Sequence, residues 1–375
     1  MKPQRIGMLG GGQLGRMLIQ KGIDWNIRFK VLDPDSSAPC SGISDFSQGK
    51  LTDFDTVLKF GEDCDLITIE IENVNTAALH ELERRGKKVY PQPRCIEVIQ
   101  DKRTQKQFYL DNGLPTSEFL LTNNRQDVIA HKAHFLPAVH KLGREGYDGR
   151  GVQVLRSEAD LPKAFDAPGV LEKFVDFKAE ISVIVARNSS GEVKSFPAVE
   201  MVFHPEANLV EYLFAPAEIS ASVEREAEHL AQVVIEKLDL VGLLAVEMFV
   251  TKDDRVLINE MAPRPHNSGH QSIEANITSQ YEQHLRAILN LPLGATTMRS
   301  PGAMVNLLGE PGYEGPARYE GLEEVLATEG VFIHLYGKVQ TRPFRKMGHV
   351  TIIDQDVESL KKKANFVRNT LKVKA

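Results

Sequence analysis

The sequence predicts a three-domain protein of mixed α/β and α+β class: a parallel-sheet domain over residues 1–93, an α+β domain over 94–293 and a small β-rich domain over 294–375. The first observation is that short apolar runs alternate with amphipathic stretches between residues 6 and 90, which is typical of βαβ units around a parallel sheet. The second is that strand-like runs separated by turn residues dominate after residue 93. A chain of 375 residues has room for two or three such domains.

The first domain is expected to contain strands over residues 6–9, 27–32, 66–69 and 88–90. Helices are expected between them, over 14–21, 54–60 and 75–85, because the apolar residues there recur at helical spacing. Asn75 is a suitable N-cap for the last of these helices and Gly86 a suitable terminator. Pro91 and Pro93 then interrupt the pattern, so the first domain is expected to close near residue 93.

The second domain is expected to begin with one long helix over residues 95–110, which Asn112-Gly113 ends. Another long helix is expected over 223–238, with Ser222 as its N-cap. Strand-like runs fill much of the rest, at 118–122, 136–141, 152–155, 179–187, 192–202, 243–251 and 255–261. A helix at 280–290 follows, and the β-rich third domain closes with a helix over 357–371.

Composition and charge argue against several classes of protein. The formal net charge is −6 and no run of Lys or Arg forms a basic stripe, so a nucleic-acid partner is not expected. No uninterrupted apolar stretch reaches the roughly 18 residues of a membrane span. The N-terminus lacks the pattern of a signal peptide, so a cytoplasmic protein is expected. The 3 cysteines form no CxxC pair, which argues against a disulfide framework and against a cysteine zinc site.

Gly10, Gly12 and Gly15 form a G-x-G-x-x-G turn between the first strand and the first helix, and Asp33 closes the next strand. Such a Rossmann-like turn aims backbone N–H groups at an anion on a helix N-terminus, which suits a dinucleotide or a phosphate monoester. Gln13 lies inside the turn, where its side chain can reach a ligand or face solvent. The turn alone leaves these alternatives open.

Two acidic residues interrupt neighbouring apolar strands near the end of the second domain. If Asp253-Asp254 form a two-residue hairpin turn, Lys252 pairs with Arg255 and Glu247 lies directly opposite Glu260. Their Cβ atoms would then be about 5 Å apart on one face of the sheet. Carboxylates that close repel each other unless a cation or a proton lies between them, and hard oxygen ligands suit magnesium. The alternative is an edge hairpin with both acids in water.

A nucleotide site is suggested by three further features. Lys141 precedes a glycine-rich loop over residues 143–151 that is suited to folding over phosphates, although it is no Walker A motif. The segment 170–175 is suited to backbone contacts with adenine, and Glu180 to contacts with ribose hydroxyls. Taken alone, each feature favours a structural role.

Taken together and in this order, Lys141, the loop 146–151, the segment 172–175, Glu180 and the pair Glu247 and Glu260 resemble the ATP-grasp superfamily. Within it, the blocks at 10–17, 70–74, 104–106, 262–270 and 346–349 are similar to the 5-(carboxyamino)imidazole ribonucleotide synthases of purine biosynthesis. The similarity extends over residues 5–355, and the blocks GYDGRG and APRPHNSGH together are its most specific part. It implies an ATP-grasp architecture in which the first domain is the pre-ATP-grasp domain, and a homodimer.

This resemblance implies an enzyme that uses ATP to activate bicarbonate as carboxyphosphate. The exocyclic amine of 5-aminoimidazole ribonucleotide is then carboxylated, giving 5-carboxyamino-1-(5-phospho-D-ribosyl)imidazole, ADP and phosphate. ATP and Mg2+ are the implied cofactors, with Mn2+ as a second candidate ion and without biotin.

The resemblance also implies roles for individual residues. Glu247 and Glu260 would hold the metal ion. The ATP contacts would come from Lys102, Lys141, Gly146, Tyr147, Asp148, Gly149, Arg150, Gly151, Glu172, Lys173, Phe174, Val175, Glu180, Asn259 and Glu260. Bicarbonate and carboxyphosphate would lie against Arg264, His266 and Asn267, and the imidazole against Tyr147, Asp148, Arg150 and Lys338. Glu72 would face the ribonucleotide substrate. The 5′-phosphate of that substrate would bind Gly12, Gln13, Leu14, Arg345 and Lys346.

Three positions depart from the pattern of the resembled family. Lys102 stands where many relatives carry Arg, Glu145 replaces a commoner glycine, and the run 200–204 leaves the nucleotide contact expected of His204 in question.

Two other functions stay open at this point. One is a different ATP-grasp ligase, such as a formate-dependent glycinamide ribonucleotide transformylase. The other is a dinucleotide-binding oxidoreductase, which rests on the glycine turn and Asp33; a nucleotide-binding regulatory protein is less consistent with two opposed carboxylates.

Overall fold

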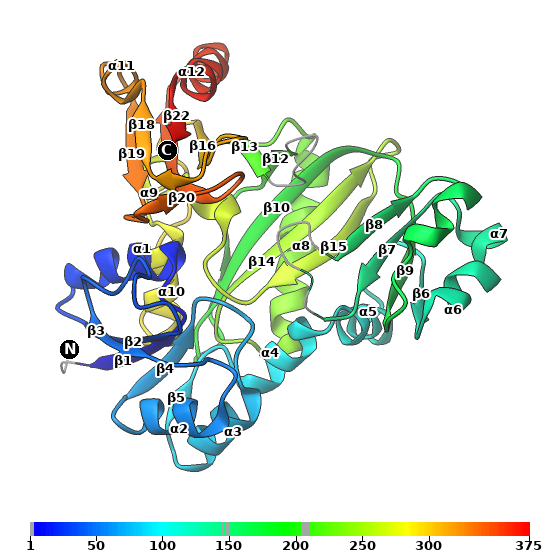
Figure 1. Cartoon of the computed structure of the whole chain (residues 1–375), viewed down its shortest axis with the longest axis horizontal. Helices are drawn as coiled ribbons and strands as arrows, with labels where there is room; N and C mark the ends of the chain where they lie inside the picture. The colour runs from blue at the N-terminus through cyan, green and yellow to red at the C-terminus, as the bar shows by residue number, and fades with distance from the viewer. Residues whose placement is uncertain (1–3, 145, 147–150, 204–209) are drawn as a thin grey trace.

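A computed structural model describes residues 4–144, 146, 151–203 and 210–375 (Figure 1). The roles predicted for Tyr147, Asp148, Gly149 and Arg150 therefore fall outside the described residues, as do the departures at Glu145 and His204. Figure 1 shows the first domain in blue, the end domain in orange and red beside it, and a smaller sheet at the far side of the molecule.

The first domain is built on a parallel sheet, as predicted. Its strands lie in the order β3 (Asp45–Gln48), β2 (Arg28–Asp33), β1 (Arg5–Leu9), β4 (Leu66–Ile69), β5 (Lys88–Val89), and every neighbouring pair is parallel. The helix α1 (Gln13–Ile23) covers one face, and α2 (Phe54–Glu62), α3 (Thr76–Arg84) and α4 (Pro93–Gln100) pack against the other. The strand β3 was not predicted, because its half-polar residues at the sheet edge carry no apolar run.

The predicted helix over 95–110 is wrong, because two helices meet at Asp101. The backbone of Asp101 is extended, at φ −122° and ψ 112°, and its carboxylate caps α5 (Lys102–Asp111) by accepting from Arg103 N. Lys102 N donates to Gly143 O at 2.7 Å. The break therefore directs the first residue of α5 toward the glycine-rich segment.

The smaller sheet has the strand order β6 (Phe119–Thr122), β9 (Gly169–Lys173), β7 (Ala138–Leu142), β8 (Val152–Leu155). The helices α6 (Arg125–Ala130) and α7 (Lys132–Phe135) and the 3-10 helix η1 (Glu158–Lys163) enclose its apolar face. The glycine-rich segment joins β7 to β8, so it lies between strands as predicted.

A large sheet runs from the second domain into the third. Its order is β15 (Val256–Ala262), β14 (Gly242–Thr251), β10 (Phe177–Arg187), β12 (Val199–Phe203), β13 (Val210–Ala215), β16 (Gly302–Leu308), β21 (Lys346–Ile353), β19 (Val331–Leu335), with β11 (Val193–Ser195) beside β10. The helix α8 (Ala221–Leu238) packs on the part nearest β14, and α12 (Val357–Thr370) on the part formed by β16 and β21. The N-cap of α8 is Ser220, whose side chain accepts from Val223 N, and not Ser222 as predicted.

Short elements complete the chain: η2 (Asn267–Gly269), α9 (Ser272–Ala275), β17 (Gly315–Pro316), β18 (Arg318–Glu320), α11 (Leu322–Leu326), β20 (Gln340–Thr341) and β22 (Lys372–Lys374). Among the described residues, no helix combines the length and apolar character that crossing a membrane requires.

The helix α10 (Gln280–Ile288) joins the first two domains. It lies beside α1 (Figure 1) and adds Tyr281, Leu285 and Ile288 to the apolar core around β1 and β2. His284 on the same helix is fully buried, with Nε2 3.0 Å from Thr68 Oγ1 of β4. A neutral imidazole is thus enclosed where the two domains meet.

We expect His284 to make stability depend on pH. Burial lowers its pKa from 6.5 to about 3, so the unfolded chain takes up the proton first as the pH falls. The stability due to His284 is therefore complete above about pH 6.5 and declines as the pH drops toward 3. In urea unfolding, the difference in free energy of unfolding between wild type and His284→Asn should shrink by about 2 kcal/mol between pH 7 and pH 5. A difference that stays constant would contradict this assignment.

Candidate active site

The hairpin of β14 and β15 brings Glu247 and Glu260 opposite each other, as predicted, but by a different geometry. Thr251 N donates to Arg255 O at 2.9 Å, so the turn has three central residues and Lys252 does not pair with Arg255. Asp254, in the turn, has φ +63°. Met248 pairs with Ile258, but the next residue, Glu247, pairs with Glu260, so a β-bulge at Asn259 shifts the register by one residue. The two differences from the prediction compensate each other.

The bulge at Asn259 decides which side chains face the site. Ile258 and Met261 both belong to the core against α8, whereas regular alternation would put one of them on the other face. Asn259 and Glu260 are therefore both on the face away from α8, which Glu247 shares. Three oxygen-bearing side chains gather there as a result.

A buried cluster of charges lies next to this face. Lys141 Nζ is 3.0 Å from Glu172 Oε1 and donates to Asn259 Oδ1 at 2.7 Å. Lys106 Nζ is 2.9 Å from Glu172 Oε2, and the Ser117 hydroxyl donates to the same oxygen at 2.6 Å. Burial would raise the pKa of Glu172, but the charges of Lys141 and Lys106 outweigh it and hold the pKa well below its ordinary value. Glu172 is thus ionised and fixes both lysines.

This arrangement gives Glu172 a structural role in addition to the nucleotide role predicted for it, which stays a prediction. The residue is 3% exposed, its carboxylate is bound to two lysines, and it is not among the residues that line the cavity described next. Sequence reasoning gave no role to Lys106, although it lies in the block 104–106 that carried part of the resemblance. Its partner Glu172 is distant in the sequence, so spacing alone gave no signal of the contact.

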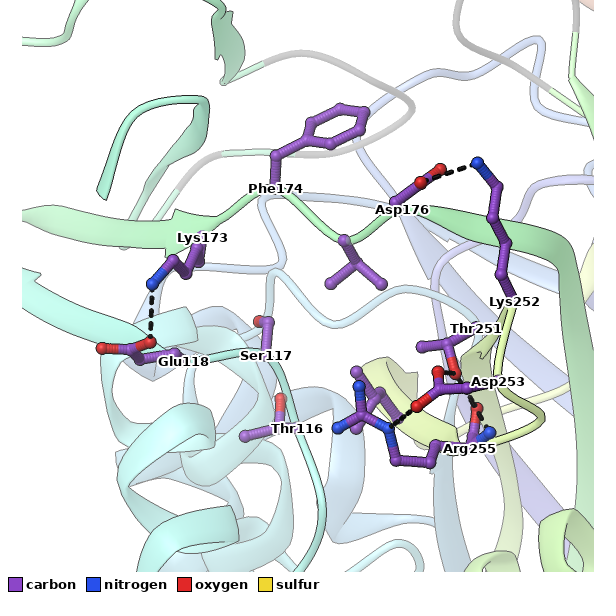
Figure 2. A pocket seen from close by; sticks show the side chains of 12 residues that line it. Thr116, Ser117, Glu118, Lys173, Phe174, Asp176, Thr251, Lys252, Asp253 and Arg255 are labelled. Carbon is purple, nitrogen blue, oxygen red and sulfur yellow. Dashed lines mark hydrogen bonds and ion pairs between the residues drawn. The ribbon is translucent and has the colours of Figure 1, made fainter. Parts of the chain in front are cut away.

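A cavity of about 830 Å3 opens between the smaller sheet and the hairpin turn. Figure 2 shows two ion pairs at the edges of this cavity: Lys173 with Glu118 on the side of the smaller sheet, and Asp176 with Lys252 of the hairpin turn. The structure thus brings three predicted nucleotide residues to one cavity: its lining includes Lys173, Phe174 and Val175, together with Thr251, Lys252, Asp253 and Arg255 of the hairpin. Glu180 is not part of the lining; burial raises its pKa to about 7, and Glu260 adds to the effect.

The two opposed carboxylates differ in charge state. Lys102 forms an ion pair with Glu260 and lowers the pKa of that carboxyl, which is therefore ionised. Burial raises the pKa of Glu247 well above its ordinary value, and the charges of Glu260 and Glu180 raise it further. Without a cation, Glu247 therefore favours its protonated form and Glu260 its ionised form. This donor set of two carboxylates and the Asn259 oxygen fits a hard divalent cation such as Mg2+.

No three His, Cys, Asp or Glu side chains in the described part of the chain form a complete metal site by themselves. Mg2+ typically takes one or two carboxylates and completes its shell with phosphate oxygens and water. The pair therefore suits a metal ion that binds with a phosphorylated ligand.

The segment after β15 brings the predicted bicarbonate residues to the same place. His266 Nε2 lies 3.4 Å from Glu247 Oε1, and His266 Nδ1 lies 2.9 Å from Ser268 Oγ. Ser268 Oγ in turn contacts Ser182 Oγ of β10 at 2.8 Å. Asn267 Nδ2 is buried and has no hydrogen-bond partner among the described residues. A buried donor of this kind is what an anionic ligand requires.

Arg264 connects this segment to the first domain. Its Nε lies 2.8 Å from Glu72 Oε1, just beyond the carboxyl end of β4. Ligands of open parallel sheets bind in the crevice at this end of the strands. The segment after β15 holds Arg264 and His266, and Arg264 meets Glu72 of the first domain. The three predicted residues therefore lie where the two domains meet.

The glycine turn of the first domain binds two acidic side chains of its own. Glu70 Oε1 accepts from Leu14 N at 3.2 Å, and a Cβ on Gly12 would lie 2.4 Å from the same oxygen. Asp33 Oδ2 accepts from Gly11 N at 2.7 Å. Glu70 thus accepts the hydrogen bond of Leu14 N–H in this structure, and the phosphate role predicted for Leu14 stays a prediction. Glu70 was missed by sequence reasoning, although it lies two residues before Glu72 in the same block.

The end domain reaches this turn. Lys338 Nζ donates to Gln13 Oε1 at 3.0 Å and to Lys346 O at 2.7 Å. Arg345 Nη1 donates to Gln340 O at 2.7 Å, and its charge contributes to a lowered pKa of Asp35, behind the bonds from Ser37. The predicted phosphate residues Gln13, Arg345 and Lys346 therefore lie in one region, where the first and third domains meet.

Comparisons with known proteins match three family models to successive parts of the chain. Residues 3–100 match the ribonucleotide synthetase preATP-grasp domain, residues 107–281 the ATP-grasp domain, and residues 302–363 the phosphoribosylaminoimidazole carboxylase C-terminal domain. The N5-carboxyaminoimidazole ribonucleotide synthase of Synechococcus elongatus is 39% identical over 93% of this chain and 89% of its own length. The phosphoribosylaminoimidazole carboxylase of Saccharomyces cerevisiae is 36% identical over 98% of this chain but 66% of its own length.

Solved structures give the same result. The crystal structure of N5-carboxyaminoimidazole ribonucleotide synthetase from Thermotoga maritima superposes with a TM-score of 0.92, at 40% identity over 99% of both chains. The Aspergillus clavatus enzyme, solved in complex with ADP and 5-aminoimidazole ribonucleotide, has a TM-score of 0.89 at 32% identity, over 98% of this chain and 99% of that one. The expected ATP-grasp architecture is confirmed. This chain belongs to the family that its sequence resembles, the N5-carboxyaminoimidazole ribonucleotide synthases, which are ATP-dependent ligases of purine biosynthesis.

Proposed function

We propose that this chain carboxylates the exocyclic amine of 5-aminoimidazole ribonucleotide with bicarbonate, at the expense of ATP. The observation that carries the proposal is the position of residues 264–267. On one side His266 contacts Glu247 of the carboxylate pair, and on the other Arg264 contacts Glu72 of the first domain. A carboxyl group activated beside the nucleotide can therefore reach an amine held by the first domain without leaving the site.

On the nucleotide side, we assign adenine to the cavity lined by Lys173, Phe174 and Val175, and the phosphates to Lys141 and Lys102. Gly146 and Gly151, the described ends of the predicted phosphate loop, lie close together, because a Cβ on Gly151 would be 3.0 Å from Gly146 Cα. Glu247 and Glu260 would hold Mg2+, with Asn259 as a further oxygen donor. When bound, the metal ion neutralises charge on the transferred phosphoryl group. Lys102 beside Glu260 supplies a fixed positive charge at the same point.

The chemistry needs two bond exchanges. A bicarbonate oxygen attacks the γ-phosphorus as the bond to ADP breaks, which gives carboxyphosphate. The amine nitrogen then attacks the carboxyl carbon, phosphate leaves, and the nitrogen gives up a proton. We propose that the Arg264 guanidinium and the Asn267 amide hold the carboxyphosphate, because both are donors suited to carboxylate and phosphate oxygens. Enclosure between the domains would protect this acyl phosphate from water.

On the substrate side, we assign the 5′-phosphate to Gln13, Lys346 and Arg345, and the imidazole to the neighbourhood of Lys338 and Glu72. Lys338 brings a positive charge to Gln13 of the glycine turn, whose acids Asp33 and Glu70 accept from backbone N–H groups. Asp33 also accepts from Asp35 N at 2.8 Å, which leaves it poorly placed for a dinucleotide ribose. We further propose, from the family resemblance, a homodimer that acts in the cytoplasm.

The test is ADP release with Mg2+ present, measured with and without 5-aminoimidazole ribonucleotide and bicarbonate. Strong stimulation by the ribonucleotide that disappears when bicarbonate is removed is expected. Restoration of ADP release by formate in place of bicarbonate would instead favour a formate-using ligase. ADP release that is indifferent to both substrates would contradict the proposed carboxylation.

A further inference from the structure

A stack of three histidines lies where the end domain meets the ATP-grasp domain, and none of the steps above uses it. His349 of β21 lies between His270, directly after η2, and His334 of β19. Its ring centroid is 4.5 Å from that of His270 and 4.4 Å from that of His334. His270 is 1% exposed and His349 0%. Two of the three rings of the stack are therefore buried where the two domains meet.

Gln280 fixes the proton of His270. Gln280 Oε1 accepts from His266 N at 2.8 Å and Gln280 Nε2 donates to His266 O at 2.7 Å, which determines the orientation of the amide. Gln280 Nε2 also donates to His270 Nδ1 at 3.2 Å, so that ring nitrogen is an acceptor. The Tyr281 hydroxyl also lies 3.0 Å from this nitrogen. His270 is thus neutral, with its proton on Nε2, and it is tied through one amide to both backbone groups of His266.

The other end of the stack leads to the end-domain lysines. The Tyr336 hydroxyl lies 2.9 Å from His349 Nδ1, and Lys338 Nζ lies 5.6 Å from the centre of the Tyr336 ring. Lys338 in turn donates to Gln13 of the first domain. The outer ring, His334, is held by Glu274 of α9 at 2.9 Å. A continuous series of contacts therefore runs from His266 to Gln13.

We propose that this histidine seam, defined as His270, His334, His349, Gln280 and Tyr336, sets the distance between the carboxyphosphate half and the ribonucleotide half of the site. The inference rests on the proposed function, since it uses the roles assigned there to His266, Lys338 and Gln13. The His334 and His349 rings are parallel to within 9°, and the His270 ring is tilted by 32° to that of His349. Planar rings in contact resist sliding more than aliphatic side chains do when hydrogen bonds also hold the ring edges in one orientation. The members of the seam are positioning residues, and they act on carboxyl transfer and not on ATP binding.

The experiment compares Tyr336→Phe with Thr122→Val in the full-length protein. Each variant removes one hydroxyl that contacts a buried imidazole, because Thr122 Oγ1 lies 3.0 Å from His140 Nε2 in the smaller sheet. For each protein we would measure KM for ATP, KM for 5-aminoimidazole ribonucleotide, and the ratio of radiolabelled carboxylated product to ADP. For Tyr336→Phe we expect a rise of fivefold or more in KM for the ribonucleotide, a lower product-to-ADP ratio, and KM for ATP within twofold of wild type. Thr122→Val should leave all three unchanged.

Two results would overturn the inference. The first is a Tyr336→Phe variant with an unchanged KM for the ribonucleotide and an unchanged product ratio, whatever its thermal midpoint. The second is an equal effect in Thr122→Val, which would show that any buried hydroxyl matters. If the wild-type protein itself lacks ribonucleotide-stimulated ADP release, the proposed function fails and the inference with it. A normal wild type beside a normal Tyr336→Phe removes the inference alone.

Discussion

Glu260→Gln is expected to lower kcat for ADP formation by at least a hundredfold. Glutamine keeps the size of the side chain but removes the charge that pairs with Lys102 and that a metal ion would need. Metal ions supply several kcal/mol of transition-state stabilisation in phosphoryl transfer, and each 1.4 kcal/mol or so is a factor of ten in rate. The measurement is ADP release at saturating ATP over a series of Mg2+ concentrations.

The matched control is Asp254→Asn, which makes the same charge change at the hairpin turn. Asp254 is exposed and its ion-pair partner there is Lys178. Asparagine also tolerates the positive φ of this position. The control should keep wild-type kcat. If Glu260→Gln retains more than a third of wild-type ADP formation while remaining folded, Glu260 is not a metal ligand.

Glu172→Gln is expected to destabilise the protein by about 3–5 kcal/mol, because it leaves two buried ammonium groups without a counter-charge. Lys106 and Lys141 both lie within 3.0 Å of the Glu172 carboxylate, and the Lys106 side chain is 3% exposed. The measurement is the free energy of unfolding in urea. Glu158→Gln, which breaks an exposed pair with Lys132, should lose no more than about 1 kcal/mol.

A second variant separates charge from packing at this cluster. Glu172→Gln combined with Lys106→Met should recover part of the lost stability, since one uncompensated charge is removed. A loss below about 1 kcal/mol in Glu172→Gln would show that the two lysines are neutral or hydrated there.

The hairpin shows how far local patterns determine the site. Two acids on adjacent apolar strands were enough to predict that Glu247 faces Glu260. The turn length and the bulge were not predicted, because Asn259 reads as an ordinary strand residue and a three-residue turn looks like a two-residue one. The predicted pairing was correct because these two differences cancel.

The first domain was predictable because its strands and helices repeat with regular periods. The break between α4 and α5 was missed, although Asp101 is a suitable N-cap for a helix that begins at Lys102. The contacts of Lys106 with Glu172 and of Glu70 with Leu14 were not predictable from local sequence. They join segments that are far apart in the chain, and only the packing of the strands brings them together. The family resemblance supplied positions that no local pattern indicated, such as Lys338 and Arg345.

The ladder between β13 and β16 has a consequence for the way the chain can be divided. Tyr212 pairs with Val305 and Phe214 with Ala303, so strands of the second and third domains share backbone hydrogen bonds. Three family matches suggest three separable modules, but a fragment that stops before residue 302 would present β13 as a bare edge, with Phe214 stripped of its cover. In evolutionary terms, the second and third domains are expected to be inherited together. A recombination event that replaced only one of them would also have to supply a strand that pairs with β13 or with β16.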